Sequence, residues 1–252
     1  MEEKDNSRYI LQSVQTAFSI LDLFIDHDEL QPAEITNLTG MNRSKAFRFL
    51  VTLEQCGYIS KSKSGGYRLS PKVSTLGQLA QNRSELISLI HPQLEVLSEQ
   101  TGESAHLNVM QNKTHTIFID KCLGSLYLRM DLALGYTSPA HVSACGKAML
   151  STMSDQDINY YIMHTTFQPR SKTSVQDAKD LLERLAKIRE QGYAVEIEEA
   201  EDGLSCISVP IFSGDRAICA ISVSGPTTRI MKNKEHIKEC LFNSKTIIEK
   251  SL

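Results

Sequence analysis

Apolar residues repeat at helical spacing in three consecutive segments near the start of the chain. In the first, 13–26, they recur three, four and seven positions apart, and Ser13 is the expected cap. The second begins at Pro32 and stops before Gly40, which are typical residues for the start of a helix and for the position after its end. Asn42 is the expected N-cap of the third. The pattern therefore predicts three short helices.

The third helix divides into an apolar and a polar face when its residues are placed about 100° apart. The apolar face consists of Ala46, Phe49, Leu50 and Leu53. The polar face consists of Ser44, Lys45, Arg48, Thr52 and Gln55. Burial of the first face leaves the second available to a partner.

Two short strands are predicted after this helix, which is expected to end at Gly57. The stretches YISKS and GGYRLS are joined through Ser64, Gly65 and Gly66, and glycines tolerate the positive φ of tight hairpin turns. Three helices followed by a hairpin are the order of a winged helix-turn-helix.

Charge changes the interpretation of this region. The whole chain has a net charge of -3, but residues 41–72 contain seven basic residues and one acidic residue, so their net charge is +6. Such a basic patch is typical of a surface that faces phosphates, although charge runs also occur on solvated faces. The candidate partner is double-stranded DNA.

Two groups of residues are candidates for DNA contacts. Side chains near the start of the third helix are expected to reach base edges in the major groove: Asn42, Arg43, Ser44, Lys45 and Arg48. Basic side chains of the hairpin are expected to bind phosphates: Lys61, Lys63 and Arg68.

The second half of the chain alternates predicted strands and helices. A helical stretch over 84–101 contains Pro92 as an expected break, and it is followed by strand-like segments that include 104–111, 115–122 and 126–134. Helices are predicted within 145–165, 175–192 and 232–250, and further strands over 193–199, 205–212 and 217–226. The expected fold class is α+β, with a winged helix-turn-helix over 8–70, a helical linker over 71–83 and an α/β domain over 84–252.

Composition excludes several other classes. Hydrophobic residues make up 41% and charged residues 23% of the 252 positions, and no apolar run is long enough to cross a membrane. The first ten residues are polar and unlike a secretory signal, so a cytoplasmic protein is expected. The six cysteines and seven histidines lack the spacing of metal sites, and no metal or cofactor is predicted.

Six stretches in this order and spacing resemble the IclR family of bacterial transcriptional regulators. They are SVQTAFSILDLF, SKAFRFLVTLEQCGYI, GGYRLSPKVSTLG, HVSACGKAML, IREQGYAVEIEEAEDGLSC and AISVSGPTTRI. The resemblance covers nearly the whole chain. It implies a winged helix-turn-helix joined by a helical linker to an effector-binding domain similar to GAF and PAS folds.

The resemblance also implies partners and a binding site. It implies a homodimer or a dimer of dimers, and a small-molecule effector, often a carboxylate or aromatic acid, that alters the affinity for DNA. The implied effector residues are Ser138, Ala144, Cys145, Gly146, Glu196, Cys206, Ser222 and Ser224.

Physical arguments agree with parts of this set. Ser222 and Ser224 are two apart on a predicted strand, so their hydroxyl groups lie on one face and require partners. The peptide N–H groups of the ACGK stretch open a predicted helix and form a candidate anion site. Glu196 disfavours a carboxylate effector nearby unless a ligand hydroxyl group binds it.

Two other functions are compatible with the same residues. Cys145 has Lys147 and His141 nearby in sequence, which allows a cysteine-dependent enzyme, but no nucleophile motif accompanies them. The second domain could also dimerise without binding any ligand.

Overall fold

The computed structural model describes residues 9–169 and 171–252, and the chain divides between Arg83 and Ser84 into two compact units. The predicted start of the DNA-binding domain, residue 8, lies outside the described residues. The helix predicted as a linker belongs by its contacts to the first unit.

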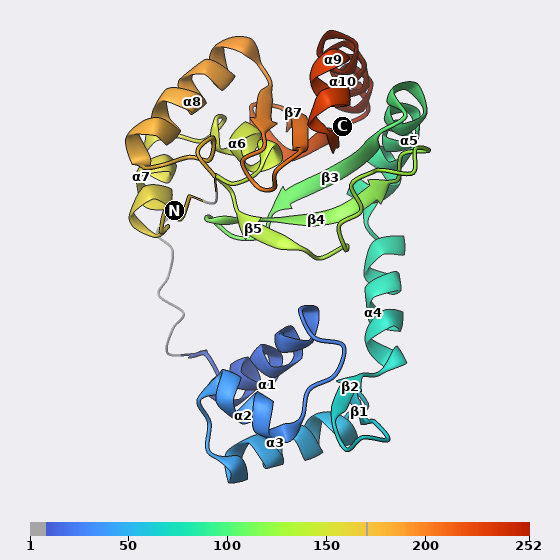
Figure 1. The fold of residues 1–252 in the computed structure, drawn as a ribbon, viewed down its shortest axis with the longest axis vertical. Helices are drawn as coiled ribbons and strands as arrows, with labels where there is room; N and C mark the ends of the chain where they lie inside the picture. The colour runs from blue at the N-terminus through green and yellow to red at the C-terminus, as the bar shows by residue number, and fades with distance from the viewer. Residues whose placement is uncertain (1–8, 170) are drawn as a thin grey trace. The chain divides into compact units, whose positions relative to one another are not determined.

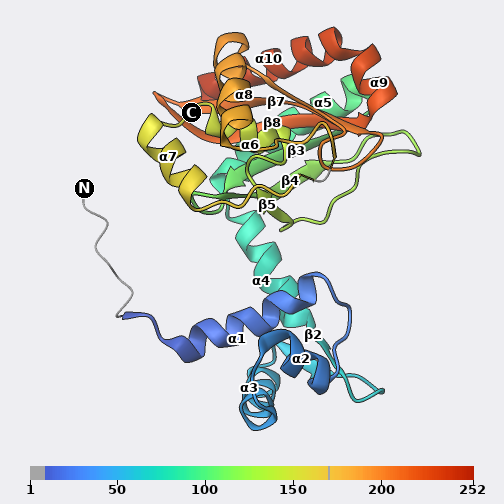
Figure 2. The same ribbon diagram turned by 60° about the vertical axis from the view of Figure 1, so that its left-hand side comes forward.

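Within the described residues, the first unit begins with helices α1, α2 and α3 (Figure 2). Helix α1 spans Gln12–Asp22 and continues into a short 3-10 turn, η2, over Leu23–Ile25; α2 spans Pro32–Thr39, and α3 spans Arg43–Gln55. The prediction that Ser13 caps α1 is wrong. The helix starts at Gln12 and its N-cap is Leu11, two residues earlier than predicted, because the carbonyl group of Leu11 already accepts the first helical bonds, from Val14 and Gln15.

The predicted ends of α2 and α3 are confirmed. Pro32 is the first residue of α2, and Gly40 follows the helix with φ of 67°. The side-chain oxygen of Asn42 caps α3 by accepting from the backbone N–H of Lys45 at 2.8 Å. These local signals need no tertiary contact, because they satisfy backbone groups at the helix ends.

The predicted hairpin is also confirmed. Strand β1, Ile59–Lys61, pairs antiparallel with β2, Tyr67–Leu69, and Gly65 takes a φ of 86° in the connecting turn. Helix α4, Pro71–Asn82, follows. The core of the unit gathers apolar side chains from α1, η2, α2, α3 and the hairpin, chiefly Ile20, Phe24, Ile35, Leu50, Leu53, Ile59 and Tyr67.

The second unit is built on a six-stranded sheet with the order β5-β4-β3-β8-β7-β6 (Figure 1). All neighbouring strands in it are antiparallel. The strands are β3 Ser104–Met110, β4 His115–Cys122, β5 Thr137–Pro139, β6 Ala194–Ile197, β7 Leu204–Ser213 and β8 Arg216–Pro226.

Helices cover both faces of this sheet. Helices α5, Glu85–Thr101, α9, Thr227–Lys232, and α10, Lys234–Ser251, share one hydrophobic core with it. The second core lies with α6, Ala144–Leu150, α7, Asp155–Met163, and α8, Ala178–Gln191. Figure 1 shows α6, α7 and α8 grouped apart from α5, α9 and α10. Both faces are therefore buried, although every strand pair is antiparallel.

Two predicted features of this unit are wrong. Pro92 does not break α5, because Ile90, Leu94 and Leu97 on either side are fully buried and hold both halves against the sheet. The segment 126–134 is not a strand, because β5 occupies the place beside β4. It instead forms a loop whose carbonyl groups accept from Ser104 and Lys121.

Candidate functional site

The basic face of α3 is exposed as predicted. Arg43, Ser44, Lys45 and Arg48 all lie on the surface, while Leu50 is fully buried. Within the described residues, the three basic side chains make no ion pair. Their charges are therefore available to a partner. Asn42 is exposed too, but its side-chain oxygen already holds the helix end, so one of the two groups needed for a bidentate contact with adenine is in use.

The three basic side chains of the hairpin differ in whether a carboxylate lies close to them. Lys63 is exposed and has no ion-pair partner among the residues described, whereas the ammonium group of Lys61 lies 3.8 Å from a carboxylate oxygen of Glu54. The Nε of Arg68 donates to Glu29 at 2.7 Å. The local charge counted along the sequence therefore overstates the free charge of the hairpin.

Glu29 lies outside residues 41–72, the range over which the local charge was counted in the sequence. Its carboxylate accepts hydrogen bonds from the hydroxyl groups of Ser62 and Ser64 and from Arg68, and these bonds lower its pKa from 4.5 to about 2. A side chain at Gly66 would overlap Glu29, so this glycine provides the space for the contact. Glu29 thus holds the turn of the hairpin in place.

Polar side chains form two rows across one face of the second unit's sheet. In the first row Ser104 faces Ser224, which faces Cys206, which faces Glu196. In the second row His106 faces Ser222, which faces Ser208. The residues between them, such as Leu107, Val223 and Ile207, point to the opposite face and are fully buried in the apolar core.

A cavity of 220 Å³ lies over these rows. Seven of the eight residues predicted to bind the effector line it: Ser138, Ala144, Cys145, Glu196, Cys206, Ser222 and Ser224. They come from β5, α6, β6, β7 and β8, which are far apart in sequence. The structure therefore brings together a predicted set that has no local pattern.

Gly146 is not among the lining residues. A side chain at this position would overlap the backbone of Ala140, so Gly146 allows α6 to approach that segment closely. Its N–H group donates to the side chain of Ser143 at 3.0 Å. The cap thus occupies this donor, and the anion site at the start of α6 stays a prediction for the N–H groups of Ala144 and Cys145.

Glu196 is fixed at the edge of the cavity. Its Oε1 accepts from the backbone N–H groups of Glu199 and Ala200 at 2.7 and 3.1 Å, and burial raises the pKa of its carboxyl group. These bonds hold the segment that contributes Ala200, Glu201 and Leu204 to the lining. Glu196 is therefore both a wall of the cavity and an anchor for the adjacent loop.

A buried ion pair also holds the loop that contains Glu199. The ammonium group of Lys147 lies 2.6 Å from Glu199, and the guanidinium group of Arg184 lies 3.1 Å from it. Lys147 and Glu199 are almost completely buried. Burial lowers the pKa of Lys147, and the Coulomb attraction and hydrogen bond of Glu199 oppose that effect.

Several lining residues were missed by the sequence argument, chiefly His106, Phe118, Met130, Leu132, Tyr136 and Glu201. His106 had a usable signal, because it alternates with Ser104 and Asn108 along one strand, as Ser222 does with Ser224. Met130 and Tyr136 belong to a loop segment whose path no periodicity indicates. The rings of Phe118 and Tyr136 meet edge to face with centroids 6.0 Å apart.

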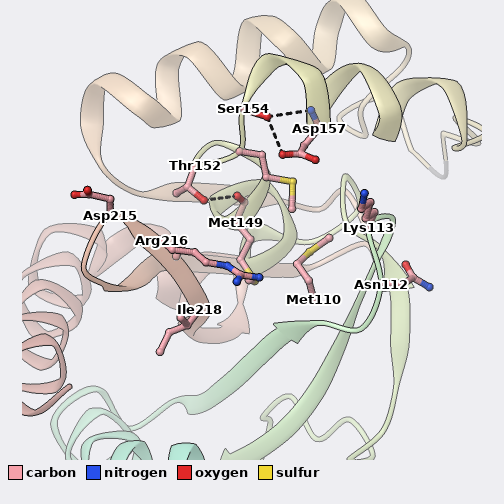
Figure 3. Close-up of a pocket in the computed structure, with 12 residues that line it drawn as sticks. Met110, Asn112, Lys113, Met149, Thr152, Ser154, Asp157, Asp215, Arg216 and Ile218 are labelled. Atoms are coloured by element: carbon pink, nitrogen blue, oxygen red, sulfur yellow. Dashed lines mark hydrogen bonds between the residues drawn. The ribbon is translucent and has the colours of Figure 1, made fainter. Parts of the chain in front are cut away.

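A second cavity, of 770 Å³, contains none of the predicted residues. Its walls come from the β3–β4 turn, the α6–α7 junction and the β7–β8 turn, and they include three methionines, Met110, Met149 and Met153. In Figure 3 the side chain of Arg216 extends past Met149 towards Met110. This cavity is larger than the first, but its polar side chains are not gathered on one buried face, so its volume alone does not favour it as the effector site.

Within 9–169 and 171–252, no group of three or more histidine, cysteine, aspartate or glutamate side chains is arranged to hold a metal ion. No helix in that part of the chain is long and apolar enough to span a membrane.

Sequence comparison assigns both units. Residues 13–63 match the IclR helix-turn-helix domain, and residues 78–246 match the bacterial transcriptional regulator IclR C-terminal domain. The chain belongs to the IclR family. It is an IclR-type transcriptional regulator with an N-terminal helix-turn-helix and a C-terminal effector-binding domain.

One relative supports the family assignment, and one solved structure shows the same fold. This IclR-family chain is 33% identical to the HTH-type transcriptional regulator XynR of Escherichia coli over 227 residues, which is 88% of each protein. An IclR regulator structure from Alicyclobacillus acidocaldarius matches with a TM-score of 0.87 at 23% identity, over 96% of this chain and 99% of that one.

One similar structure contains a ligand. An IclR homologue from Microbacterium hydrocarbonoxydans, complexed with 4-hydroxybenzoate, matches with a TM-score of 0.80 at 20% identity, over 95% of this chain and 98% of that one. At this identity the likeness shows the fold alone.

Proposed function

We propose that this IclR-family regulator binds operator DNA with an affinity set by a small metabolite in the 220 Å³ cavity. The observation that carries the proposal is the convergence of seven predicted residues, from five separate elements, on one cavity. Sparse polar groups in a mainly apolar cavity are typical of metabolite sites.

Helix α3 contacts the base edges of the operator, and the hairpin binds its phosphates. Arg43, Ser44, Lys45 and Arg48 present free polar groups on the exposed face, and Asn42 combines this position with its cap. Lys61, Lys63 and Arg68 contact phosphates, with Lys63 the freest of the three. Phosphate contacts supply salt-dependent affinity, and contacts to base edges supply the choice of sequence.

The effector is a carboxylate or aromatic acid of small size. The edge-to-face pair of Phe118 and Tyr136 offers an apolar wall for a ring, and Ser138 and Ser222 offer hydroxyl groups. An aromatic acid is also the ligand of the Microbacterium homologue. Gly146 supports this site from outside the lining.

The regulator acts as a homodimer or a dimer of dimers. Helices α1 and α4 of the first unit leave large apolar side chains exposed: Val14, Phe18, Leu76 and Leu79. An apolar surface of this kind on a small unit is typical of an interface. Sedimentation of the intact protein with Phe18→Asp and Leu79→Asp tests this assembly, because both substitutions should favour monomers.

No catalytic role is assigned to Cys145, and no cofactor is needed. Burial raises the pKa of its thiol, which opposes formation of the nucleophilic thiolate. The Nδ1 of His141 lies 2.7 Å from the hydroxyl group of Tyr161, and Lys147 is paired with Glu199. A DNA-binding regulator of this kind operates in the cytoplasm.

A ligand-free dimeric module is the alternative. The cavity and its buried polar groups favour a sensor, since a purely structural domain has no need of them. Calorimetry with the intact protein against small acids separates the two, because a sensor binds its effector with different affinity in the presence and absence of operator DNA.

Footprinting tests DNA recognition. An operator selected from a random duplex library should be protected by the wild type and by Gln55→Ala, a control on the same exposed face near the end of α3. The triple variant Arg43→Ala, Lys45→Ala, Arg48→Ala should lose protection. An unchanged footprint with this variant would contradict the proposal.

A further inference from the structure

His106 contributes an unused hydrogen-bonding atom to the smaller cavity. The side chain lies on β3, is fully buried and lines the cavity. Its Nδ1 is 3.1 Å from the hydroxyl oxygen of Ser224, whereas its Nε2 has no partner among the described residues. Buried polar atoms are rarely left without a partner, so this nitrogen indicates a group that the ligand supplies.

The ring holds a single proton near neutral pH. Burial lowers the pKa of His106 from 6.5 to about 4, and the charge of Lys121 acts in the same direction. A neutral imidazole has one nitrogen that donates and one that accepts. Whether the proton is on Nδ1 or on Nε2 therefore determines which groups Nε2 can bind.

The neighbours of Ser224 assign that donor. The hydroxyl oxygen of Ser224 is also 2.8 Å from the sulfur atom of Met130, and a thioether sulfur can only accept. A serine hydroxyl group has one hydrogen. Both bonds can form at once only if that hydrogen is directed to Met130 and the bond with His106 runs the other way, from Nδ1–H to the serine oxygen, and this arrangement leaves Nε2 as an acceptor.

We propose that the effector is a hydroxylated compound and that one of its hydroxyl groups donates to Nε2 of His106. This inference rests on the effector role proposed for the cavity and adds the chemistry that selects the ligand. It makes His106 a residue that determines specificity.

The rest of the lining agrees with a ligand rich in hydroxyl groups. Oε1 of Glu196 is occupied by two backbone N–H groups, and its second carboxylate oxygen has no partner among the described residues. Among the described residues, two carboxylates, Glu196 and Glu201, line the cavity, and no lysine or arginine does. Ligand hydroxyl groups can donate to these carboxylates, while the hydroxyl groups of Ser138 and Ser222 can donate to a ligand carboxylate.

The volume limits the size of the ligand. A cavity of about 150 Å³ holds benzene, which has six non-hydrogen atoms. In proportion, 220 Å³ accommodates a ligand of about nine non-hydrogen atoms. A four-carbon hydroxy acid such as threonate has this size, and butyrate is its counterpart without hydroxyl groups.

The proton position is tested without any ligand. In protein labelled with ¹⁵N-histidine, the ring shifts of His106, assigned by their loss in His106→Gln, should show a protonated Nδ1 and a bare Nε2. Met130→Leu removes the sulfur acceptor, so Ser224 should then donate to Nδ1 and the proton should move to Nε2. A protonated Nε2 in the wild type would overturn the proposal.

Ligand selection is tested by calorimetry on the intact protein. Threonate should bind at least about tenfold more tightly than butyrate, and 4-hydroxybenzoate more tightly than benzoate. His106→Phe keeps an aromatic ring but removes the acceptor, so it should abolish these differences, while His106→Gln, which retains an acceptor, should keep part of them. Equal affinity for the hydroxylated and unhydroxylated acids in the wild type would contradict the inference.

Neither measurement involves DNA. A failed footprint by the wild type would therefore count against the regulatory function, while the tautomer and the selectivity between paired acids would still decide the role of His106.

Discussion

The two units place their polar functional groups in opposite environments. On α3, Arg43, Lys45 and Arg48 are exposed and free of ion pairs among the residues described. In the second unit, His106 and Glu196 are buried, and hydrogen bonds to their neighbours fix the positions of their side chains. Exposed charges act through water, so each contributes little and depends on salt. Buried polar groups depend on single hydrogen bonds, and a small displacement is costly.

The largest effect is expected where the second unit is most closely packed. Gly146→Ala should destabilise it by about 3 kcal/mol, because the added methyl group overlaps the backbone of Ala140. Denaturant unfolding measures the change. Gly77→Ala in α4 is the control from the first unit, since its added methyl group meets open space, and it should stabilise by up to about 1 kcal/mol. Equal tolerance of both substitutions would remove the contrast between the units.

A smaller effect is expected on DNA binding. Arg48→Ala should weaken operator binding by about 1–3 kcal/mol if the side chain contacts a base, and it should leave the unfolding transition unchanged. Gel-shift titration measures the first effect and denaturant unfolding the second. Gln55→Ala should change neither. Loss of stability in Arg48→Ala would show that the exposed face also supports the fold.

The hairpin should show a purely electrostatic effect. Lys63→Ala should reduce the slope of log affinity against log salt concentration by about 0.9, without changing the preferred sequence. Lys61→Ala should reduce it less, because Glu54 lies 3.8 Å from its ammonium group. Binding titrations between 50 and about 200 mM salt separate the two variants. A changed sequence preference in Lys63→Ala would assign this residue a base contact.

The smallest effect concerns pH and the turn of the hairpin. Because the folded pKa of Glu29 is lowered from 4.5 to about 2, its contribution to stability is present above pH 4.5 and is lost as the pH falls towards 2. Thermal unfolding across this range should show a smaller acid dependence in Glu29→Gln. Asp28→Asn is the matched control, since its side chain makes no ion pair or hydrogen bond within the described residues. An identical pH profile for Glu29→Gln and the wild type would contradict this role.

The winged unit could be predicted closely because its signals are local. Pro32, Gly40 and Asn42 determine where helices begin and end through backbone groups within a few residues. The apolar face of α3 followed from helical spacing alone. The bond between Glu29 and Arg68 did not, because 39 positions separate the two residues.

The effector site could be predicted only in part. The positions of Ser222 and Ser224 on one strand face followed from alternation, and the family resemblance supplied Ser138, Cys145 and Glu196. Nothing in the sequence indicated that Met130, from a loop wrongly predicted as a strand, would reach Ser224. Gly146 was assigned to the ligand, but its place is decided by the backbone of Ala140.

The sequence by itself determined the two-part organisation, most of the helices and strands, and the exposed basic face that implies DNA. Periodicity, caps and charge carry this information because each acts over a few residues. Only the tertiary structure decided which polar groups share a cavity and which are already occupied. Hydrogen bonds such as the one between His106 and Ser224 join residues 118 positions apart, and the direction of each depends on every neighbour that competes for the same proton.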